Sequence, residues 1–223
     1  MTPKVTVLQL DTQFPRIPGD VACPATYCGD VEIIQIPRAT VDKIVSARPD
    51  IIDIKPFEQA VQCATGDVIV TSCGFLSYWQ NHLAALTEKP FISSALIAFD
   101  GLRQAYAAAD VITLTFDKAS LTKQHFGPNA DYDIGTVGLP RDMHLRRVIS
   151  ENLPELDVGL VANELTNFIS AIKRQHHKHL VLECTNLPPY KSQLHRATGL
   201  GITDILSCIE DIQPGSIQPQ FLI

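Results

Sequence analysis

The protein has 223 residues, which places it between one and two domains of ordinary size. It carries 18 Lys and Arg against 24 Asp and Glu, a net charge of −6, and 45% of its residues are hydrophobic. The acidic balance argues against a nucleic-acid-binding surface, and the hydrophobic content excludes an intrinsically disordered chain. The length is enough to bury a core without disulfide bonds.

No apolar run reaches the roughly 18 residues that a membrane span requires. The first ten residues lack the cleavage pattern of a secretory signal, so we expect a cytoplasmic protein that does not bind membranes. In that compartment the six cysteines are expected to be core residues, metal ligands or reactive thiols rather than disulfides.

Short β-branched runs alternate with longer amphipathic stretches along the chain. The predicted strands are residues 4–10, 31–36, 67–72, 110–116, 134–139, 179–183 and 202–205. The predicted helices are residues 54–65, 76–87, 94–108, 141–150, 159–176 and 190–198. This order is typical of α/β folds in which helices cover both faces of parallel sheets. We expect a first domain of residues 1–92 and 200–223 and a second domain of residues 93–199.

The first predicted strand leads into residues 12–29, a long connection rich in Pro and Gly. Long connections of this kind are often lids or binding loops, and the alternative is a surface excursion without a role. Arg16 in this loop could bind a second substrate carboxylate, unless it is a solvated surface charge. Cys23 and Cys28 lack a second ligand pair, so zinc binding is not expected there.

Two cysteines end similar strand patterns half a chain apart. Cys73 follows Val-Ile-Val-Thr-Ser and Cys184 follows Leu-Val-Leu-Glu, and a helix start comes soon after each. The repetition predicts two similar α/β halves, each with one thiol at a strand tip, where ligands bind in such folds. The N–H groups of the following helix are expected to lower the thiol pKa from about 8.5 and favour the thiolate. The alternative is burial in the core, which we expect for Cys63 and Cys208.

Two thiols on opposite walls of one cleft suit a particular reaction. One thiolate removes a proton from a carbon next to a carboxylate, and the other thiol protonates the opposite face, so that the centre inverts. The reaction needs neither a metal nor pyridoxal phosphate. The transient carbanion needs hydrogen-bond donors aimed at its carboxylate oxygens. The residues placed to supply these donors are Ser72, Gly74, Thr185 and Asn186.

Three motifs make the sequence resemble the aspartate/glutamate racemase superfamily, whose members use two cysteines and no cofactor. They are Thr71-Ser72-Cys73-Gly74, Glu183-Cys184-Thr185-Asn186 and Leu10-Asp11-Thr12. The resemblance implies two Rossmann-like three-layer domains with parallel sheets, related by pseudo-twofold symmetry, and an active site in the cleft between them. It implies that Cys73 and Cys184 are the paired acid and base, that Asp11 assists Cys73, and that the protein forms a homodimer. The expected binding site for a small carboxylate substrate is Thr12, Arg16, Ser72, Gly74, Phe75, Thr185 and Asn186.

The superfamily includes aspartate, glutamate and hydantoin racemases, maleate isomerase and arylmalonate decarboxylase. Glutamate racemases have Asn-Thr after the first cysteine and Thr-His after the second, where this chain has Gly74-Phe75 and Thr185-Asn186. Because both thiols are present, we expect racemization or epimerization of aspartate, glutamate or a related small acid, in amino acid metabolism. The alternatives left open are a hydantoin racemase, a maleate isomerase-like enzyme, a decarboxylase, or a protein that binds a metabolite without turnover.

The remaining chemistry-bearing residues have simpler interpretations. His176, His177 and His179 are interpreted as partners of a helix carboxyl end rather than as metal ligands. His195 and the Tyr78-Trp79 pair are interpreted as packing or surface residues, with a wall of the cleft as the alternative for the aromatic pair. We therefore expect no metal site and no cofactor.

Overall fold

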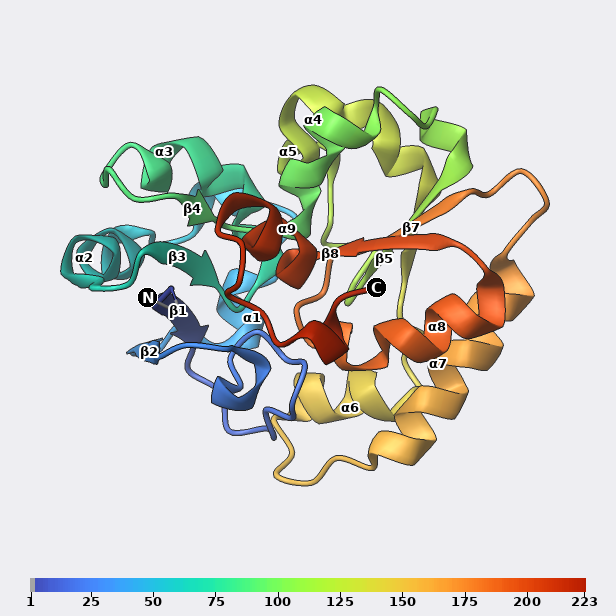
Figure 1. Ribbon diagram of the computed structural model, residues 1–223, viewed down its shortest axis with the longest axis horizontal. Helices are drawn as coiled ribbons and strands as arrows, with labels where there is room; N and C mark the ends of the chain where they lie inside the picture. Colours follow the sequence, from blue (N-terminus) through green and yellow to red (C-terminus); the bar gives the residue numbers. More distant parts are fainter. Residues whose placement is uncertain (1–2) are drawn as a thin grey trace.

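The structure is a computed structural model that describes residues 3–223. It contains two four-stranded parallel sheets, each flanked by helices (Figure 1). The first sheet has the strand order β2-β1-β3-β4, and the second has the corresponding order β6-β5-β7-β8. The expected architecture of two Rossmann-like α/β domains is therefore confirmed.

The strands are β1 (Val5–Leu10), β2 (Val31–Ile36), β3 (Val68–Thr71), β4 (Phe91–Ile92), β5 (Val111–Thr115), β6 (Thr136–Gly138), β7 (His179–Leu182) and β8 (Gly201–Asp204). The α-helices are α1 (Val41–Ile44), α2 (Lys55–Cys63), α3 (Gln80–Ala84), α4 (Phe99–Leu102), α5 (Lys123–Phe126), α6 (His144–Glu151), α7 (Val158–Ile172), α8 (Lys191–Thr198) and α9 (Ile205–Ile212). The 3-10 helices cover Pro24–Thr26, Pro49–Ile51, Gly74–Trp79, Ala95–Ala98, Ala108–Asp110, Gly127–Gly135, Pro188–Tyr190 and Pro219–Phe221.

The two central strands of each sheet form the core of their domain. All residues of β3, β5 and β7 are buried, and β1 is buried except for Gln9. Uninterrupted apolar and β-branched runs form these strands because a parallel sheet covered on both faces buries successive side chains on either side. Since the two sheets have corresponding strand orders, the carboxyl ends of β3 and β7 occupy equivalent places in the two domains.

Several elements differ from the sequence-based expectation. The segment expected to be helical over 76–87 begins as the 3-10 helix Gly74–Trp79 and continues as α3, and the helix expected over 94–108 ends at Leu102. Apolar residues spaced three and four apart fit both helix types, so the pattern does not separate them. The two-residue strand β4 and the four-residue helices α1 and α5 are too short to give a periodic signal.

The boundary between the domains lies later than expected. β8, which was assigned to the first domain, pairs with β7 in the second sheet. The chain returns to the first domain with α9, whose Ile205 and Ile209 pack in one core with Val5 and Val70. The strand expected over 202–205 overlaps α9 only at Ile205, and the sequence pattern did not predict this helix, because a short apolar run fits a strand and a buried helix equally well.

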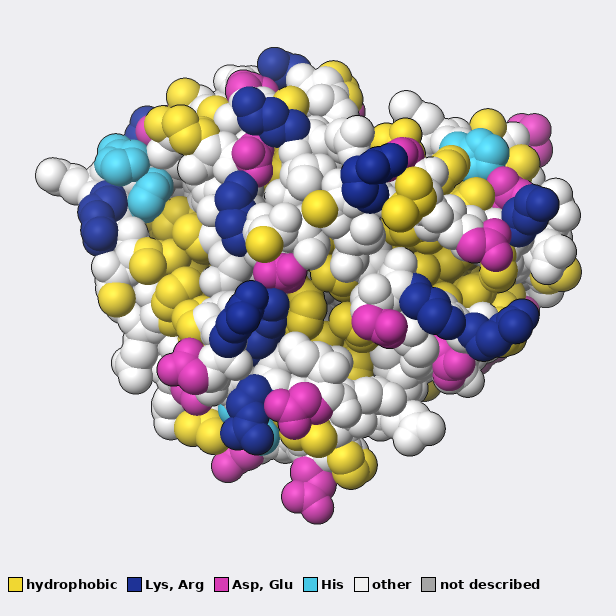
Figure 2. All heavy atoms as spheres, turned by 180° about the vertical axis from the view of Figure 1, so that it is seen from behind, with side chains coloured by type: hydrophobic (Ala, Val, Ile, Leu, Met, Phe, Trp, Pro, Cys, Tyr) yellow, Lys and Arg dark blue, Asp and Glu magenta, His cyan; other side chains and the backbone are white. Residues whose placement is uncertain are grey.

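The mixture of charged and apolar side chains on the surface agrees with the composition. Lys, Arg, Asp and Glu are interspersed on the face seen in Figure 2, with apolar side chains visible in the hollows between them. Within residues 3–223, no helix combines the length and the apolar character that crossing a bilayer requires.

Candidate active site

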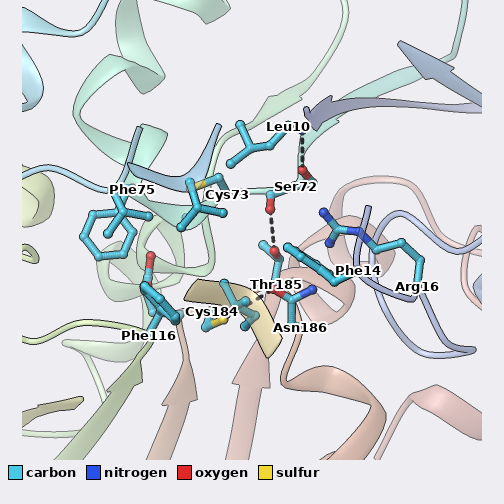
Figure 3. A pocket seen from close by; sticks show the side chains of 15 residues that line it. Leu10, Phe14, Arg16, Ser72, Cys73, Phe75, Phe116, Cys184, Thr185 and Asn186 are labelled. Carbon is cyan, nitrogen blue, oxygen red and sulfur yellow. Dashed lines mark hydrogen bonds between the residues drawn. The ribbon is translucent and has the colours of Figure 1, made fainter. Parts of the chain in front are cut away.

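The two thiols singled out by the strand pattern line one pocket between the two sheets (Figure 3). One residue separates Cys73 from the end of β3, and one residue separates Cys184 from the end of β7. Each cysteine is 7% exposed, and the empty space of the pocket, including the solvent at its open side, is about 360 Å³. In Figure 3 the two side chains enter the pocket from different sides, one from each domain. The strand-end pattern therefore places both sulfur atoms against the same small volume.

The expectation that these thiols have a lowered pKa is wrong. Burial and the nearby Glu183 carboxylate raise the pKa of Cys73 to about 12, and burial raises the pKa of Cys184 as well. Hydrogen bonds from the backbone N–H groups of Phe75 and Asn186 act in the expected direction on their respective thiols, but the cost of burying a charge is larger. The thiolate therefore needs positive charge beside it, and the Arg16 guanidinium is a group that lowers the pKa of Cys73.

Arg16 is a pocket residue held in place rather than a solvated loop charge. Its Nη1 lies 3.3 Å from the Asp20 carboxylate, and its Nη2 donates to Thr12 Oγ1 at 3.0 Å. The guanidinium also lies over the Phe14 ring, 4.4 Å from its centroid. The buried Nε–H has no hydrogen-bond partner, so one donor of the guanidinium remains available in a fixed position.

Residues 12–29, which we call the strap, run from the first domain onto the second. The backbone N–H groups of Gln13 and Phe14 donate to Asn152 Oδ1 at 2.7 and 3.3 Å, and the Asp20 carboxylate accepts from Asn186 Nδ2 at 2.6 Å. Three apolar side chains of the strap are buried in the core of the first domain: Val21, Ala22 and Tyr27. The strap is therefore not a surface excursion, and it positions Arg16 over the pocket.

The two predicted residues at the start of the strap region do not line the pocket. The Asp11 carboxylate accepts from Gln35 Nε2 at 3.0 Å and from the backbone N–H of Arg38 at 2.9 Å. Thr12 Oγ1 accepts from Arg16 Nη2 and donates to the Leu10 carbonyl at 3.4 Å. Asp11 therefore braces the end of β1 against the turn after β2, and Thr12 orients the guanidinium.

The other predicted residues do line the pocket. They are Arg16, Ser72, Cys73, Gly74, Phe75, Cys184, Thr185 and Asn186. The Ser72 hydroxyl accepts from the backbone N–H of Leu10 at 3.0 Å, and the Thr185 hydroxyl donates to the Ser72 carbonyl at 2.7 Å. The Ser72 hydroxyl thus joins two strand ends of the first domain, and the Thr185 hydroxyl joins the two domains. Asn186 joins the Cys184 thiol to the strap.

Glu183 is a pocket residue that the sequence reasoning left out of the site. It is fully buried, and its Oε2 accepts from Thr115 Oγ1 at 2.6 Å while its Oε1 has no hydrogen-bond partner. Burial raises its pKa to about 7. A Cβ at Gly74 would lie 2.6 Å from the Glu183 carbonyl oxygen and closer still to Oε1, so only glycine fits there. The available signal was an acidic residue ending an otherwise apolar strand.

Aromatic side chains complete the pocket wall. Phe14 from the strap and Phe116 after β5 both line it, and no local sequence pattern indicates either role. Tyr78 and Trp79 lie outside the pocket, where the Trp79 indole N–H donates to the Pro49 carbonyl at 3.0 Å. Packing is therefore the role of Trp79.

The remaining cysteines and histidines lie apart from the thiol pair. Cys208 is buried as expected, but Cys63 is exposed at the solvent-facing end of α2, so its assignment to the core is wrong. His179 begins β7 and stacks on Tyr106, rather than serving a helix end. Within residues 3–223, no three His, Cys, Asp or Glu side chains gather closely enough to hold a metal ion.

Comparison with curated proteins finds distant relatives of one kind. Dimethylsulfoniopropionate lyase 3 of Emiliania huxleyi is 28% identical over 232 residues, covering 92% of this chain. The dimethylsulfoniopropionate lyase of Durusdinium sp. clade D is 25% identical and covers 90% of this chain. The chain spans 58% of the length of the first relative and 70% of the second. No family model matches.

Comparison with solved structures finds the same two-domain architecture. Allantoin racemase from Pseudomonas fluorescens superposes with a TM-score of 0.56 at 10% identity, covering 94% of this chain and 88% of that one. Aspartate racemase from Picrophilus torridus gives 0.52 at 12% identity, covering 98% and 97%. A variant of arylmalonate decarboxylase gives 0.53 at 14% identity, covering 90% and 87%. The chain thus has the fold of the aspartate/glutamate/hydantoin racemase superfamily, to which these structures belong.

Proposed function

We propose that this protein is a lyase that uses a pocket thiol to cleave dimethylsulfoniopropionate into acrylate and dimethyl sulfide. The observation that carries the proposal is the pocket itself, in which two thiols and one guanidinium face a small and largely apolar volume. The curated relatives over nine-tenths of the chain are lyases named for this substrate. Their sequences and this geometry support the same chemistry, which is removal of a proton next to a carboxylate.

The proposed reaction is a β-elimination. A cysteine thiolate takes a proton from the carbon next to the substrate carboxylate, and the electron pair of that C–H bond forms the carbon–carbon double bond. The bond from the neighbouring carbon to sulfur breaks, and sulfur keeps its electron pair. One thiolate and one zwitterion thus give one thiol, acrylate and neutral dimethyl sulfide, with no oxidant, reductant or water consumed.

Arg16 is the proposed partner of the substrate carboxylate. Its unpartnered Nε–H is buried and fixed by the contacts with Asp20 and Thr12. As the proton leaves the neighbouring carbon, negative charge builds up on the carboxylate oxygens, and a preorganised cation there stabilises the transition state. The same positive charge favours the Cys73 thiolate.

Racemization of a small amino acid is the second candidate, because two thiols line the pocket and a racemase needs an acid and a base on opposite faces. Aspartate and glutamate, the substrates expected from the sequence, carry a second carboxylate that would require a second cation. Among the described residues that line the pocket, Arg16 is the only Lys or Arg. A substrate with one carboxylate therefore fits the pocket charge better.

The test measures elimination and inversion on the same preparation. The purified protein is incubated with dimethylsulfoniopropionate, and dimethyl sulfide in the headspace and acrylate in solution are quantified. It is also incubated in deuterium oxide with aspartate, glutamate, a hydantoin and an arylmalonate, and exchange at the carbon next to the carboxylate is followed by NMR. Dimethyl sulfide release supports the lyase. Exchange with inversion and no dimethyl sulfide would establish the racemase instead, and inactivity toward every substrate would favour a metabolite-binding protein.

Cysteine variants separate the two mechanisms further. Elimination requires one base, so one of the variants Cys73→Ser and Cys184→Ser should lose nearly all activity while the other retains a measurable part. Inversion requires both thiols, so both variants should be inactive in a racemase. Cys63→Ser is the matched control, because Cys63 is exposed and lies outside the pocket.

A further inference from the structure

The pocket carries one ionisable group of each sign besides the two thiols. Among the described residues that line it, Arg16 is the only basic side chain and Glu183 is the only acidic one. Much of the remaining wall is apolar and includes the rings of Phe14, Phe75 and Phe116. The pocket is therefore complementary to a small zwitterion, with a carboxylate at Arg16 and a cationic group at Glu183.

The Glu183 carboxyl group is held in the pocket wall, but one of its oxygens has no hydrogen-bond partner. Thr115 holds Oε2 with a 2.6 Å hydrogen bond, and the absence of a side chain at Gly74 leaves room for Oε1. The residue is fully buried, and within residues 3–223 no Lys, Arg or His forms an ion pair with it. A buried carboxylate without a positive partner is costly, so the site favours a cation arriving with the ligand.

The chemistry of the wall indicates what kind of cation this is. A primary ammonium group brings three N–H donors, each of which needs an acceptor once water is excluded. The Ser72 hydroxyl already accepts from the backbone N–H of Leu10, and the Thr185 hydroxyl donates to the Ser72 carbonyl, so the pocket hydroxyls offer too few acceptors for three N–H donors. A methylated sulfonium or ammonium has no N–H donor, and its charge is satisfied by one carboxylate and by aromatic faces.

We infer that Glu183 is the counter-ion of the cationic group of the substrate and selects a methylated onium over a primary ammonium. This inference rests on the proposed function, because it assigns the two charged ends of the proposed substrate to the two charged residues of the pocket. It makes Glu183 a specificity-determining residue rather than the base that removes the proton.

The assignment has a kinetic consequence. The positive charge on sulfur disappears as the carbon–sulfur bond breaks, so a counter-ion stabilises the bound substrate more than the transition state. Glu183 also raises the pKa of both thiols, which opposes formation of the thiolate. Glu183→Gln should therefore raise KM for the sulfonium substrate about tenfold, while kcat is retained or increased.

A pair of ligands of matched shape isolates the charge. 3-(Trimethylammonio)propanoate and 4,4-dimethylpentanoate have the same outline and the same carboxylate, and they differ by one positive charge at the other end. We call the first the cationic ligand and the second the neutral ligand, after the end opposite the carboxylate. Their dissociation constants are measured by calorimetry at pH 8 for the wild type and for Glu183→Gln. The wild type is expected to bind the cationic ligand about tenfold more tightly than the neutral one, and the variant is expected to lose this preference.

The wild type alone provides a second measurement that does not depend on a variant folding. Burial raises the pKa of Glu183 to about 7, so the affinity for the cationic ligand should rise between pH 6 and pH 8 while that for the neutral ligand should not. The charged and titratable groups that face Glu183 across the pocket are the thiols of Cys73 and Cys184, whose pKa values are raised far above this range, and the Arg16 guanidinium, which is paired with Asp20.

The outcomes distinguish this inference from the proposed function. Equal affinity of the wild type for the two ligands, or a preference that survives in Glu183→Gln, would overturn the role of Glu183 even if dimethyl sulfide is released. A charge preference that depends on Glu183, found together with an inactive wild type, would retain the counter-ion and overturn the lyase. An increase in affinity for both ligands with pH would also contradict the inference.

Discussion

The Thr185 hydroxyl donates a 2.7 Å hydrogen bond to the carbonyl oxygen of Ser72, so the residue after one thiol is tied to the residue before the other. Ser72 in turn accepts the backbone N–H of Leu10 at 3.0 Å, at the end of β1. These buried contacts join strand ends of both domains within one short chain of hydrogen bonds. The separation of the two thiols is thus fixed by a specific polar contact and not by apolar packing alone.

Removal of this contact should loosen the domain interface. Thr185→Val keeps the shape of the side chain but leaves the Ser72 carbonyl without this partner, so we expect the free energy of unfolding to fall by about 1–3 kcal/mol. Urea denaturation measures the change. Thr185→Ser keeps the hydroxyl and should stay within about 1 kcal/mol of the wild type. A valine variant as stable as the serine variant would show that the hydrogen bond contributes nothing.

Gly74 should tolerate no side chain. A Cβ there collides with the carbonyl and carboxyl oxygens of Glu183, so Gly74→Ala should destabilise the protein by about 1–3 kcal/mol and reduce turnover. Gly101→Ala is the control, because no atom lies within 4 Å of the Cβ it would add. Thermal denaturation of the two variants checks the prediction. It is wrong if both alanine variants unfold at the temperature of the wild type.

Asn152 should hold the strap in place over the pocket. This residue adopts a left-handed conformation, with φ of 52°, and its Oδ1 accepts from the backbone N–H groups of Gln13 and Phe14. Asn152→Gly keeps the backbone conformation but removes the acceptor, so Arg16 and Phe14 lose a constraint and KM should rise about three- to tenfold. Asn152→Asp retains an acceptor oxygen and should change KM much less. Steady-state kinetics on whichever substrate is turned over makes the comparison. Equal KM values for the two variants would contradict the role of Asn152 in holding the strap.

Glu183 should make stability depend on pH. Burial raises its pKa from 4.5 to about 7 in the folded protein, so the folded state holds its proton at pH values where the unfolded chain has released it. Its contribution to stability is full below pH 4.5 and is lost as pH rises toward 7, a change of roughly 3 kcal/mol. The stability of the wild type relative to Glu183→Gln should therefore fall between pH 5 and pH 8.

The variant comparison is needed because two histidines act in the opposite direction. Burial lowers the pKa of His125 and of His179 to about 4, so they add stability as pH rises from 4 toward 6.5. Both histidines remain in Glu183→Gln, so their contribution cancels in the difference between the two proteins. Urea denaturation at four pH values across this range gives that difference. A difference that stays constant with pH would rule out the raised pKa of Glu183.

The sequence by itself determined the features that depend on neighbouring residues. Apolar runs with Val and Ile define β1, β3, β5 and β7, because a strand buried on both faces needs an uninterrupted apolar segment. The same local patterns place Cys73 and Cys184 two residues beyond the last residues of β3 and β7. The repeated pattern predicted two similar halves with one thiol at a strand end in each, and the resemblance to the racemase superfamily implied that the two halves share one cleft.

Only the tertiary structure decided how the surroundings act on these groups. Burial and Glu183 reversed the expected direction of the thiol pKa shifts, because the desolvation of a charge depends on residues that are distant in sequence. The anchoring of the strap by Asn152 and by Asn186 joins segments that are far apart in the chain and whose spacing carries no signal. A local pattern identifies which groups can react, whereas burial and long-range contacts set their charge and the ligand that they can accept.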